Sequence, residues 1–345
     1  MTLTPRKEAI LATVVRNYIR SGEPVGSKSL CDELGGVSSA TIRNEMNELD
    51  GLGYLAQPHT SAGRIPTDRA FRLYLDRLMK PRTLTEKEEQ LLDSLLPPPD
   101  NDSERTLRRT AKALADVTHC AAFYTVEAGS GIRIHKVELI PMSSRTALLV
   151  LVTSDGDVHS RMFHFQIPLT PALIERFLSL VDTKLIGLNV ADIQPALLQT
   201  LVAGAGEFAL PLTPLIAALA DRIEETCESR IELVGQSNLL LCGEFSPVRM
   251  REILDLFLRR EEVLTMLEVW HREIGVLLGG ETAYPALAAT ALALARYRLP
   301  DHRTGYLGLL GPRRMDYSVV LPTLQYVTGV LGAGMATLKK GRTTQ

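Results

Sequence analysis

The segment of residues 38–69 constrains the fold of this chain more than any other. Ser38 can cap a helix, and Ile42, Met46 and Leu49 then recur at positions i, i+4 and i+7. Because an α-helix turns by about 100° per residue, these three side chains form one buried stripe, and polar residues face the other way. The segment predicts an amphipathic helix with a polar outer face, followed by a short basic loop.

The outer face of this helix carries side chains that suit the major groove of DNA. Arginine can form a bidentate contact with guanine and asparagine with adenine, while alanine or threonine can contact a thymine methyl group. Free N–H groups at the start of the helix can also bind a phosphate. The alternative is an ordinary solvated helix face, and the helix alone does not decide between them. The candidate contacts are Ser38, Ser39, Ala40, Thr41, Arg43, Asn44 and Asn47.

The flanking segments favour DNA binding. Thr4-Pro5 predicts the start of a first helix, Ser27 can cap a short second helix, and Gly35-Gly36 provides a turn before the third. This order of elements is that of a helix-turn-helix.

A wing is expected after the third helix. Residues 53–55 leave the helix as a strand-like stretch, and Gly63-Arg64 is expected at the tip of a loop. Such a loop can place basic and polar side chains against a phosphate or in the minor groove, although an isolated arginine is more often a plain surface charge. The further candidate contacts are Lys28, His59, Thr60, Ser61 and Arg64.

Several motifs resemble one known family. They are Ser39–Met46, Gly53–Leu55, Pro58–Thr67 and Gly311–Tyr317, with a weaker match at Val234–Leu240. Together they resemble the heat-inducible transcription repressor HrcA, and they span nearly the whole chain. Two segments depart from the family pattern. Gly279–Thr282 stands where the family more often has Gly-x-Glu-Asn, and Pro97–Pro99 is unusual for the linker.

The resemblance implies an α+β fold with an N-terminal winged helix-turn-helix and a GAF-like domain that carries an inserted, mostly helical dimerisation domain. It implies a homodimer that binds double-stranded DNA at an inverted-repeat operator, the element called CIRCE, and represses chaperone operons of the groE and dnaK type. The GroEL chaperonin would keep the repressor active, and heat stress would divert the chaperonin and release repression.

Proline-rich stretches and changes in the pattern of apolar residues suggest the domain limits. Three prolines followed by acidic residues form a stiff spacer at 97–102. Strand-like runs then give way to leucine-rich helical stretches from about residue 170. Strands are expected at 121–126, 132–140, 145–153, 158–167, 230–234 and 273–278, with an Asp155-Gly156 hairpin. Helices are expected at 171–182, 191–203, 214–227 and 247–270, and residues 286–298 fit helix or strand.

We therefore expect five segments. They are a winged helix-turn-helix DNA-binding domain at 1–82, a linker at 83–102, a first GAF-like part at 103–169, an inserted dimerisation domain at 170–268 and a second GAF-like part at 269–345.

Charge and composition limit the classes of function. The chain of 345 residues has a net charge of −2, so it is not a globally basic nucleic-acid coat. Residues 1–82 contain 12 Lys/Arg and 9 Asp/Glu. This small excess suits a binding site that relies on a few well-placed cations more than one that relies on a broad positive potential. No apolar run reaches the roughly 18 residues of a membrane helix, and the start does not resemble a signal peptide. We expect a cytoplasmic protein without membrane association.

Neither a cofactor nor a metal is expected. The four cysteines lack the spacing of a zinc site, and His159 and His164 would lie on opposite faces of a strand. No phosphate-loop, nucleophile-elbow or zinc-protease motif occurs, so an enzyme is not expected. Two alternatives to a heat-shock repressor stay open: a regulator that senses a small molecule through its GAF-like domain, and a structural dimerisation protein.

Overall fold

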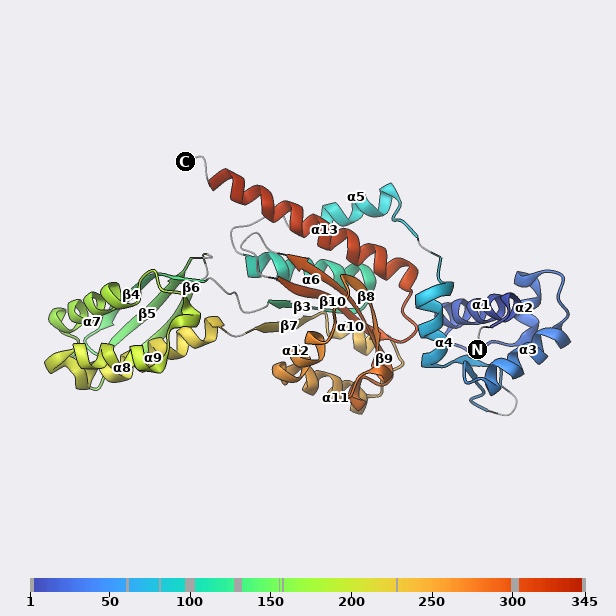
Figure 1. The fold of residues 1–345 in the computed structure, drawn as a ribbon, viewed down its shortest axis with the longest axis horizontal. Helices are drawn as coiled ribbons and strands as arrows, with labels where there is room; N and C mark the ends of the chain where they lie inside the picture. The colour runs from blue at the N-terminus through green and yellow to red at the C-terminus, as the bar shows by residue number, and fades with distance from the viewer. Residues whose placement is uncertain are drawn as a thin grey trace.

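The computed structural model describes residues 3–59, 62–80, 82–96, 103–126, 132–154, 156, 158–227, 229–298 and 304–342. Three bodies lie in a row, with the N-terminal module at one end (Figure 1). The predicted contacts Thr60 and Ser61, the proline spacer at 97–102 and Asp155 of the hairpin lie outside the described residues.

The N-terminal module is a winged helix-turn-helix. Its elements are α1 (Pro5–Ser21), α2 (Ser27–Leu34), α3 (Ser39–Gly51), β1 (Leu55–Ala56), β2 (Ile65–Pro66), α4 (Asp68–Leu73) and the π-helical turn η1 (Tyr74–Leu78). Thr4 caps α1 as expected, since its hydroxyl accepts from the Lys7 N–H. The predicted cap of α2 is one residue off: Gly26 is the N-cap, and the Ser27 hydroxyl instead contacts Ser39 at 3.0 Å.

The predicted linker contains a helix. Thr85 and Glu88 form a capping box at the start of α5 (Glu86–Leu95), which satisfies free N–H groups at that end. Leu92 of α5 is buried, and Asp93 accepts a 2.8 Å hydrogen bond from Tyr326 of the C-terminal helix. Residues 83–96 therefore include a helix that packs against the body.

The central domain is a five-stranded antiparallel sheet between two layers of helices. The strand order is β7-β3-β10-β9-β8. Helices α6 and α13 lie on one face, and α10 to α12 lie on the other (Figure 1). The elements are α6 (Ser103–Thr118), β3 (Ala121–Val126), β7 (Arg230–Val234), α10 (Ser237–Leu241), α11 (Pro247–Leu258), α12 (Arg260–Glu268), β8 (Ile274–Leu278), the 3₁₀ turns η4 (Gly279–Glu281) and η5 (Pro285–Leu287), β9 (Thr290–Arg298), β10 (Thr304–Pro312) and α13 (Tyr317–Arg342).

Alternation along β9 explains these two layers. Ala291, Ala293 and Ala295 face the cluster that contains α13, whereas Leu292 and Leu294 face the cluster of α11 and α12. A strand buried on both faces reads as a continuous apolar run. The ambiguous segment at 286–298 is therefore a strand, preceded by a 3₁₀ turn.

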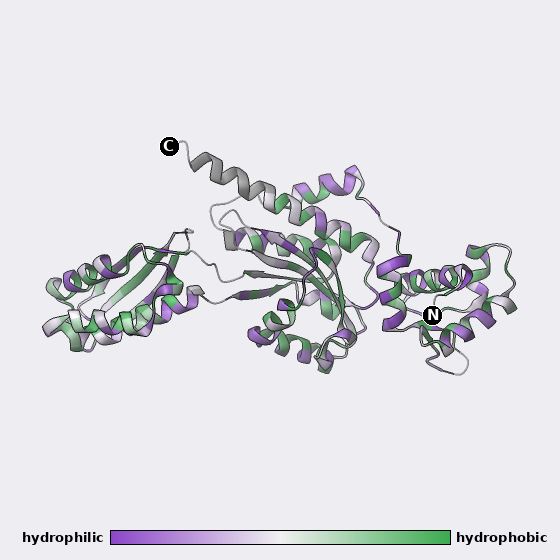
Figure 2. Ribbon diagram, in the orientation of Figure 1, coloured by the Kyte–Doolittle hydropathy of each residue, from purple (hydrophilic) through white to green (hydrophobic). Residues whose placement is uncertain are grey.

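The third body is an insertion between β3 and β7, which are neighbours in the central sheet. It has its own hydrophobic core, separate from the clusters of the central domain. Hydrophobic residues prevail in its three-stranded sheet (Figure 2). Its elements are β4 (Ile134–Ser143), β5 (Thr146–Thr153), β6 (Val158–His164), α7 (Pro171–Lys184), η2 (Val190–Asp192), α8 (Pro195–Gly204), η3 (Gly206–Phe208) and α9 (Ala209–Cys227).

The structure corrects two sequence-based boundaries. The expected insert at 170–268 is shifted, because β4 to β6 share a core with α7 to α9, whereas α10 to α12 pack on the central sheet. A change from strands to helices does not mark a domain limit when one core contains both. The expected helix at 247–270 is two helices, since the chain bends at Arg259. The protein thus has an α+β fold with a winged helix-turn-helix and a GAF-like domain that carries an insert.

Candidate DNA-binding surface

Helix α3 has the cap and the stripe that its sequence predicts. The Ser38 hydroxyl accepts from the Thr41 N–H at 3.2 Å and lies 2.9 Å from the Thr41 hydroxyl. Ile42, Met46 and Leu49 are buried in the core of the module. Gly35 and Gly36 both have positive φ, a conformation that glycine adopts readily, and this allows the tight turn between α2 and α3. The cap, the buried stripe and the turn fix the orientation of α3 relative to α2 and to the core of the module.

The outer face of α3 holds two polar side chains that are free to meet a ligand. Arg43 and Asn44 are exposed, and within the described residues neither side chain makes a hydrogen bond or an ion pair. Ala40 is also exposed, whereas Ser39 and Thr41 are half-buried. Lys28 is exposed near the start of α2. A guanidinium and an amide without internal partners can form bidentate contacts with base edges.

Arg64 is placed differently from its expectation. It does not lie at the tip of the wing, because its backbone pairs with Val25 through two hydrogen bonds of 2.9 Å. Its side chain is only 16% exposed; it binds Asp50 at 2.8 Å and donates to the side-chain Oδ1 of Asn47 at 2.9 Å. Arg64 therefore fastens the wing to α3, and it also holds Asn47 on one side of the groove-facing surface.

Gly63 permits this attachment. A Cβ at Gly63 would overlap the backbone of Val25, so only glycine allows the two segments to approach so closely. The Ala62 N–H donates to the His59 carbonyl at 2.9 Å, and His59 is exposed. Gly63 therefore lies at the base of the wing, next to the Val25–Arg64 pairing.

A hollow of about 370 Å³ separates α3 from the wing. Residues of α3, of the wing and of the start of α2 line it, among them Arg43, Asn47, Gln57 and Arg64. Because α3 and the wing line it together, they form one continuous surface.

Acidic residues of α3 are neutralised within the module. Lys7 of α1 binds Glu45 at 2.8 Å and Glu48 at 2.9 Å. The hydrogen bonds from Glu45 and Glu48 raise the pKa of Lys7, so this lysine stays charged. Arg6 lies 3.9 Å from Glu45, and Arg64 pairs with Asp50. Three cations thus offset three carboxylates that would otherwise repel a nearby phosphate backbone.

Sequence reasoning missed Val25 and Asp50 as parts of this surface. Val25 carries no chemical signal, because its role is a backbone pairing. Asp50 lies three residues after Asn47 on α3, and its partner Arg64 comes from the wing. The signal that could have identified Asp50 is the contact of α3 with the wing, because it brings Asp50 next to Arg64.

Among the described residues, no three His, Cys, Asp or Glu side chains converge into a metal-binding group. His164 contacts Thr146 at 3.2 Å. Within the described part of the chain, no single helix is long and apolar enough to cross a membrane. Two helices joined by a sharp bend, Pro195–Gly204 and Gly206–Thr226, together have the length and composition of a membrane span.

Comparison with known proteins agrees with this architecture. Residues 104–321 match the family described as "HrcA protein C terminal domain". The chain is 32% identical over 333 residues to the heat-inducible transcription repressor HrcA of Acetivibrio thermocellus, covering 95% of each chain. It is 33% identical over 336 residues to the repressor of the same name from Desulforudis audaxviator, covering 95% of this chain and 96% of that one.

A solved structure also matches over the full length. The crystal structure of a hypothetical protein at 2.2 Å resolution has a TM-score of 0.68 and 26% sequence identity, and the match covers 97% of this chain and 99% of that chain. The curated relatives carry the names of transcription repressors, which are regulators and not enzymes. Family model, relatives and fold agree, and the chain belongs to the heat-inducible transcription repressor HrcA family.

Proposed function

We propose that this heat-shock transcriptional repressor acts in the cytoplasm as a homodimer that binds a CIRCE-type inverted repeat and represses chaperone operons of the groE and dnaK type. The GroEL chaperonin maintains its activity, and heat stress removes that support. The observation that carries the proposal is the exposed pair Arg43 and Asn44 on α3, without partners in the described chain and next to a wing.

The DNA contacts divide into two kinds. Arg43, Asn44 and Ala40 face outward on α3 and read base edges, while Lys28 and the exposed His59 contact the phosphate backbone. Ser38, Ser39 and Thr41 lie at the start of α3, where N–H groups and hydroxyls suit a phosphate. Asn47 and Arg64 hold the wing and the helix in register.

Dimerisation is supported by an open face of the insert. One face of the β4-β5-β6 sheet packs on helices, and the other carries Ile140, Val158 and Met162, which are 45%, 62% and 47% exposed. Ile140, Leu148 and Met162 are cross-strand neighbours, so they form a continuous apolar strip. Because an inverted repeat has twofold symmetry, a second copy of this chain is the partner that such a self-complementary face fits.

The role of the chaperonin is supported by exposed apolar side chains of the central domain. Leu241, Leu258 and Val269, on or directly after α10, α11 and α12, are each more than three-quarters exposed. Exposed apolar surface is what a chaperonin that holds non-native chains would bind, and this supports the proposed contact.

A gel shift of the full-length protein on a CIRCE-type repeat tests the proposal. Binding is measured at about 50 and about 200 mM salt, with and without chaperonin, beside a scrambled duplex. We expect specific binding that weakens with salt, because counterions are released from phosphates, and that chaperonin increases. Arg251→Ala, an exposed helical arginine in α11, is the matched control and should bind like wild type.

The alternative of a small-molecule sensor predicts a different result. Such a regulator would bind its operator poorly until a metabolite is added and would not respond to chaperonin. Specific binding without any ligand, combined with a response to chaperonin, excludes it. Failure to prefer the repeat over the scrambled duplex under all conditions contradicts the proposed function itself.

A further inference from the structure

We infer that α4 is a coupling element that positions the recognition helix, because one side of α4 binds the GAF-like domain and its N-terminal end holds the end of α3. The residues that carry this role are Arg72 and Asp68 of α4 with Glu281 and Arg313 of the GAF-like domain. The inference rests on the proposed binding of a dimer to an inverted repeat.

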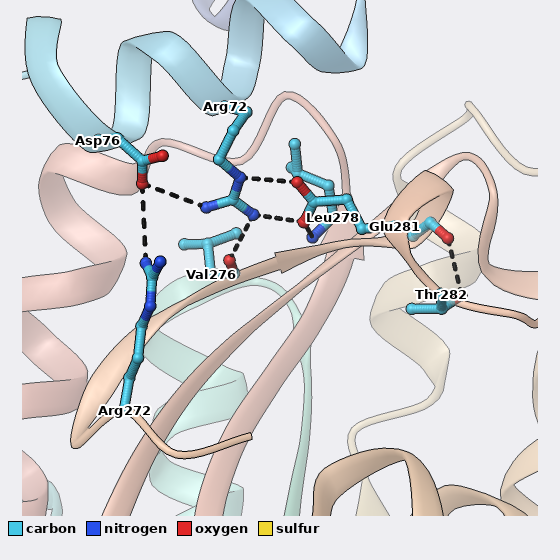
Figure 3. A network of polar contacts seen from close by, with 8 residues as sticks. Arg72, Asp76, Arg272, Val276, Leu278, Glu281 and Thr282 are labelled. Atoms are coloured by element: carbon cyan, nitrogen blue, oxygen red, sulfur yellow. Dashed lines mark hydrogen bonds and ion pairs between the residues drawn. The ribbon is translucent and has the colours of Figure 1, made fainter. Parts of the chain in front are cut away.

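Arg72 is the centre of the first contact (Figure 3). Its Nε donates to Glu281 Oε1 at 2.7 Å, and its Nη2 binds both Glu281 and the Val276 carbonyl, the latter at 2.9 Å. Glu281 is held in turn by the Leu278 N–H at 3.0 Å. A bidentate arginine–carboxylate pair restricts orientation more than a single contact does.

A second ion pair joins Asp68 to Arg313. It lies beside the first, since a Cβ on Gly280 would overlap the carboxylate of Asp68. The neighbouring Arg314 pairs with Glu244 of its own domain, but Arg313 reaches across to the N-terminal module. The segments Gly279–Thr282 and Gly311–Tyr317, both compared with the family pattern above, thus each contact α4.

The N-terminal end of α4 is tied to the end of α3. The Thr67 N–H and hydroxyl donate to the carbonyls of Tyr54 and Gly53 at 3.0 and 2.8 Å. Arg69 donates to the Leu52 carbonyl at 2.7 Å and lies over the Tyr54 ring at 4.5 Å. Any rotation of α4 must therefore move the end of the recognition helix.

An apolar contact beneath the ion pairs completes the joint. Phe71 is buried and packs edge-to-face on Tyr18 of its own module and on Tyr317 at the start of α13. Residues of both domains belong to one hydrophobic cluster. The apolar contact keeps the domains together, and the partly exposed ion pairs at its edge fix their angle.

This geometry has a direct consequence for operator recognition. In a dimer, the distance between the two recognition helices must match the spacing of the half-sites. Each helix is placed by its own α4 on a GAF-like domain. Arg72 and Glu281 are therefore positioning residues that set which spacing the dimer accepts, although neither contacts DNA.

The test is a binding series with full-length Arg72→Gln, Glu281→Gln and the double variant. The probes are the inverted repeat, repeats with one base pair inserted or removed, and a single half-site. We expect each single variant to lose about tenfold affinity for the native spacing and to discriminate less between spacings. Affinity for the half-site should not change, and the double variant should be no weaker than either single one.

A matched control separates this role from loss of charge or of stability. Arg82→Gln removes an Arg–Glu pair of similar exposure that does not join the two domains. It should behave as wild type at every spacing. The coupling is contradicted if the Arg72 and Glu281 variants match wild type on all probes, or if they lose the half-site and the repeat equally. Wild-type protein that does not prefer the repeat to the half-site contradicts the proposed function instead.

Discussion

Arg43 and Asn44 differ from the other polar residues of α3 in having no partner within the described chain. Asn47 is also exposed, yet its side-chain Oδ1 accepts a hydrogen bond from Arg64. The structure thus separates residues that can read bases from residues that build the surface, a division that helical rotation alone does not provide.

Replacing Asn44 or Arg43 by alanine should cost about 1–3 kcal/mol of specific binding, because a bidentate contact to one base is lost. The measurement is the affinity of each variant for operators with single base changes. We expect each variant to lose its preference for one base at one position of the operator. Equal losses on operator and random DNA would show that these residues contact phosphates and do not read bases.

Cys120 provides a residue-scale test of the joint between sheet and C-terminal motif. Burial raises the pKa of its thiol to about 11, and its Sγ lies 3.6 Å from Met315 Sδ. Because the thiolate is the reactive form, Cys120 should resist iodoacetamide at about pH 8 in folded protein, while the half-buried Cys31 reacts. Mass spectrometry after pulse labelling measures both, and urea should expose both. Rapid labelling of Cys120 in the folded protein would contradict its burial.

The wing is held to the module at its base by two backbone hydrogen bonds between Val25 and Arg64. Gly63→Ala should lower the free energy of unfolding of this region by about 1–3 kcal/mol, because the added Cβ displaces the Val25 carbonyl from Arg64. Gly51→Ala is the control, since a Cβ there meets nothing within 4 Å and lies at the end of a helix. Hydrogen exchange of residues 62–66 should rise in the first variant only. Protection unchanged in Gly63→Ala would mean that the wing is held otherwise.

Elements whose signal is local were predictable from the sequence. The expected strands at 121–126 and 230–234 match β3 and β7 at both ends, and the Ser38 cap of α3 is confirmed. Features that depend on a distant partner were not. The bend at Arg259 interrupts a periodicity that continues through it, and the position of Arg64 depends on Val25 and Asp50. The limits of the insert depend on which helices share a core with β4 to β6.

At the scale of the whole molecule, the hydrophobic clusters show which of the three bodies are joined. The N-terminal module and the GAF-like domain share one hydrophobic cluster, while the insert has its own. Helix α3 is therefore fixed to the central domain, and the insert is the body that would hold the second copy in the proposed dimer.

Met162→Lys should dissociate the dimer, because it places a charge in the apolar strip of the open sheet. We expect the dimer dissociation constant to rise at least about tenfold, equivalent to about 1.4 kcal/mol, in sedimentation equilibrium. Leu210→Lys is the control, since Leu210 is 89% exposed at the start of α9. A dimer unaffected by Met162→Lys, or equally weakened by Leu210→Lys, would place the interface elsewhere.

The specificity ratio of the wild-type protein tests the central claim most directly. Affinity is measured by competition for an inverted repeat, a single half-site and a scrambled duplex of equal length and composition, at one salt concentration. We predict that the repeat binds at least about 10³-fold more tightly than the scrambled duplex, with the half-site between them. Equal affinity for all three duplexes would contradict a repressor that reads an operator through α3.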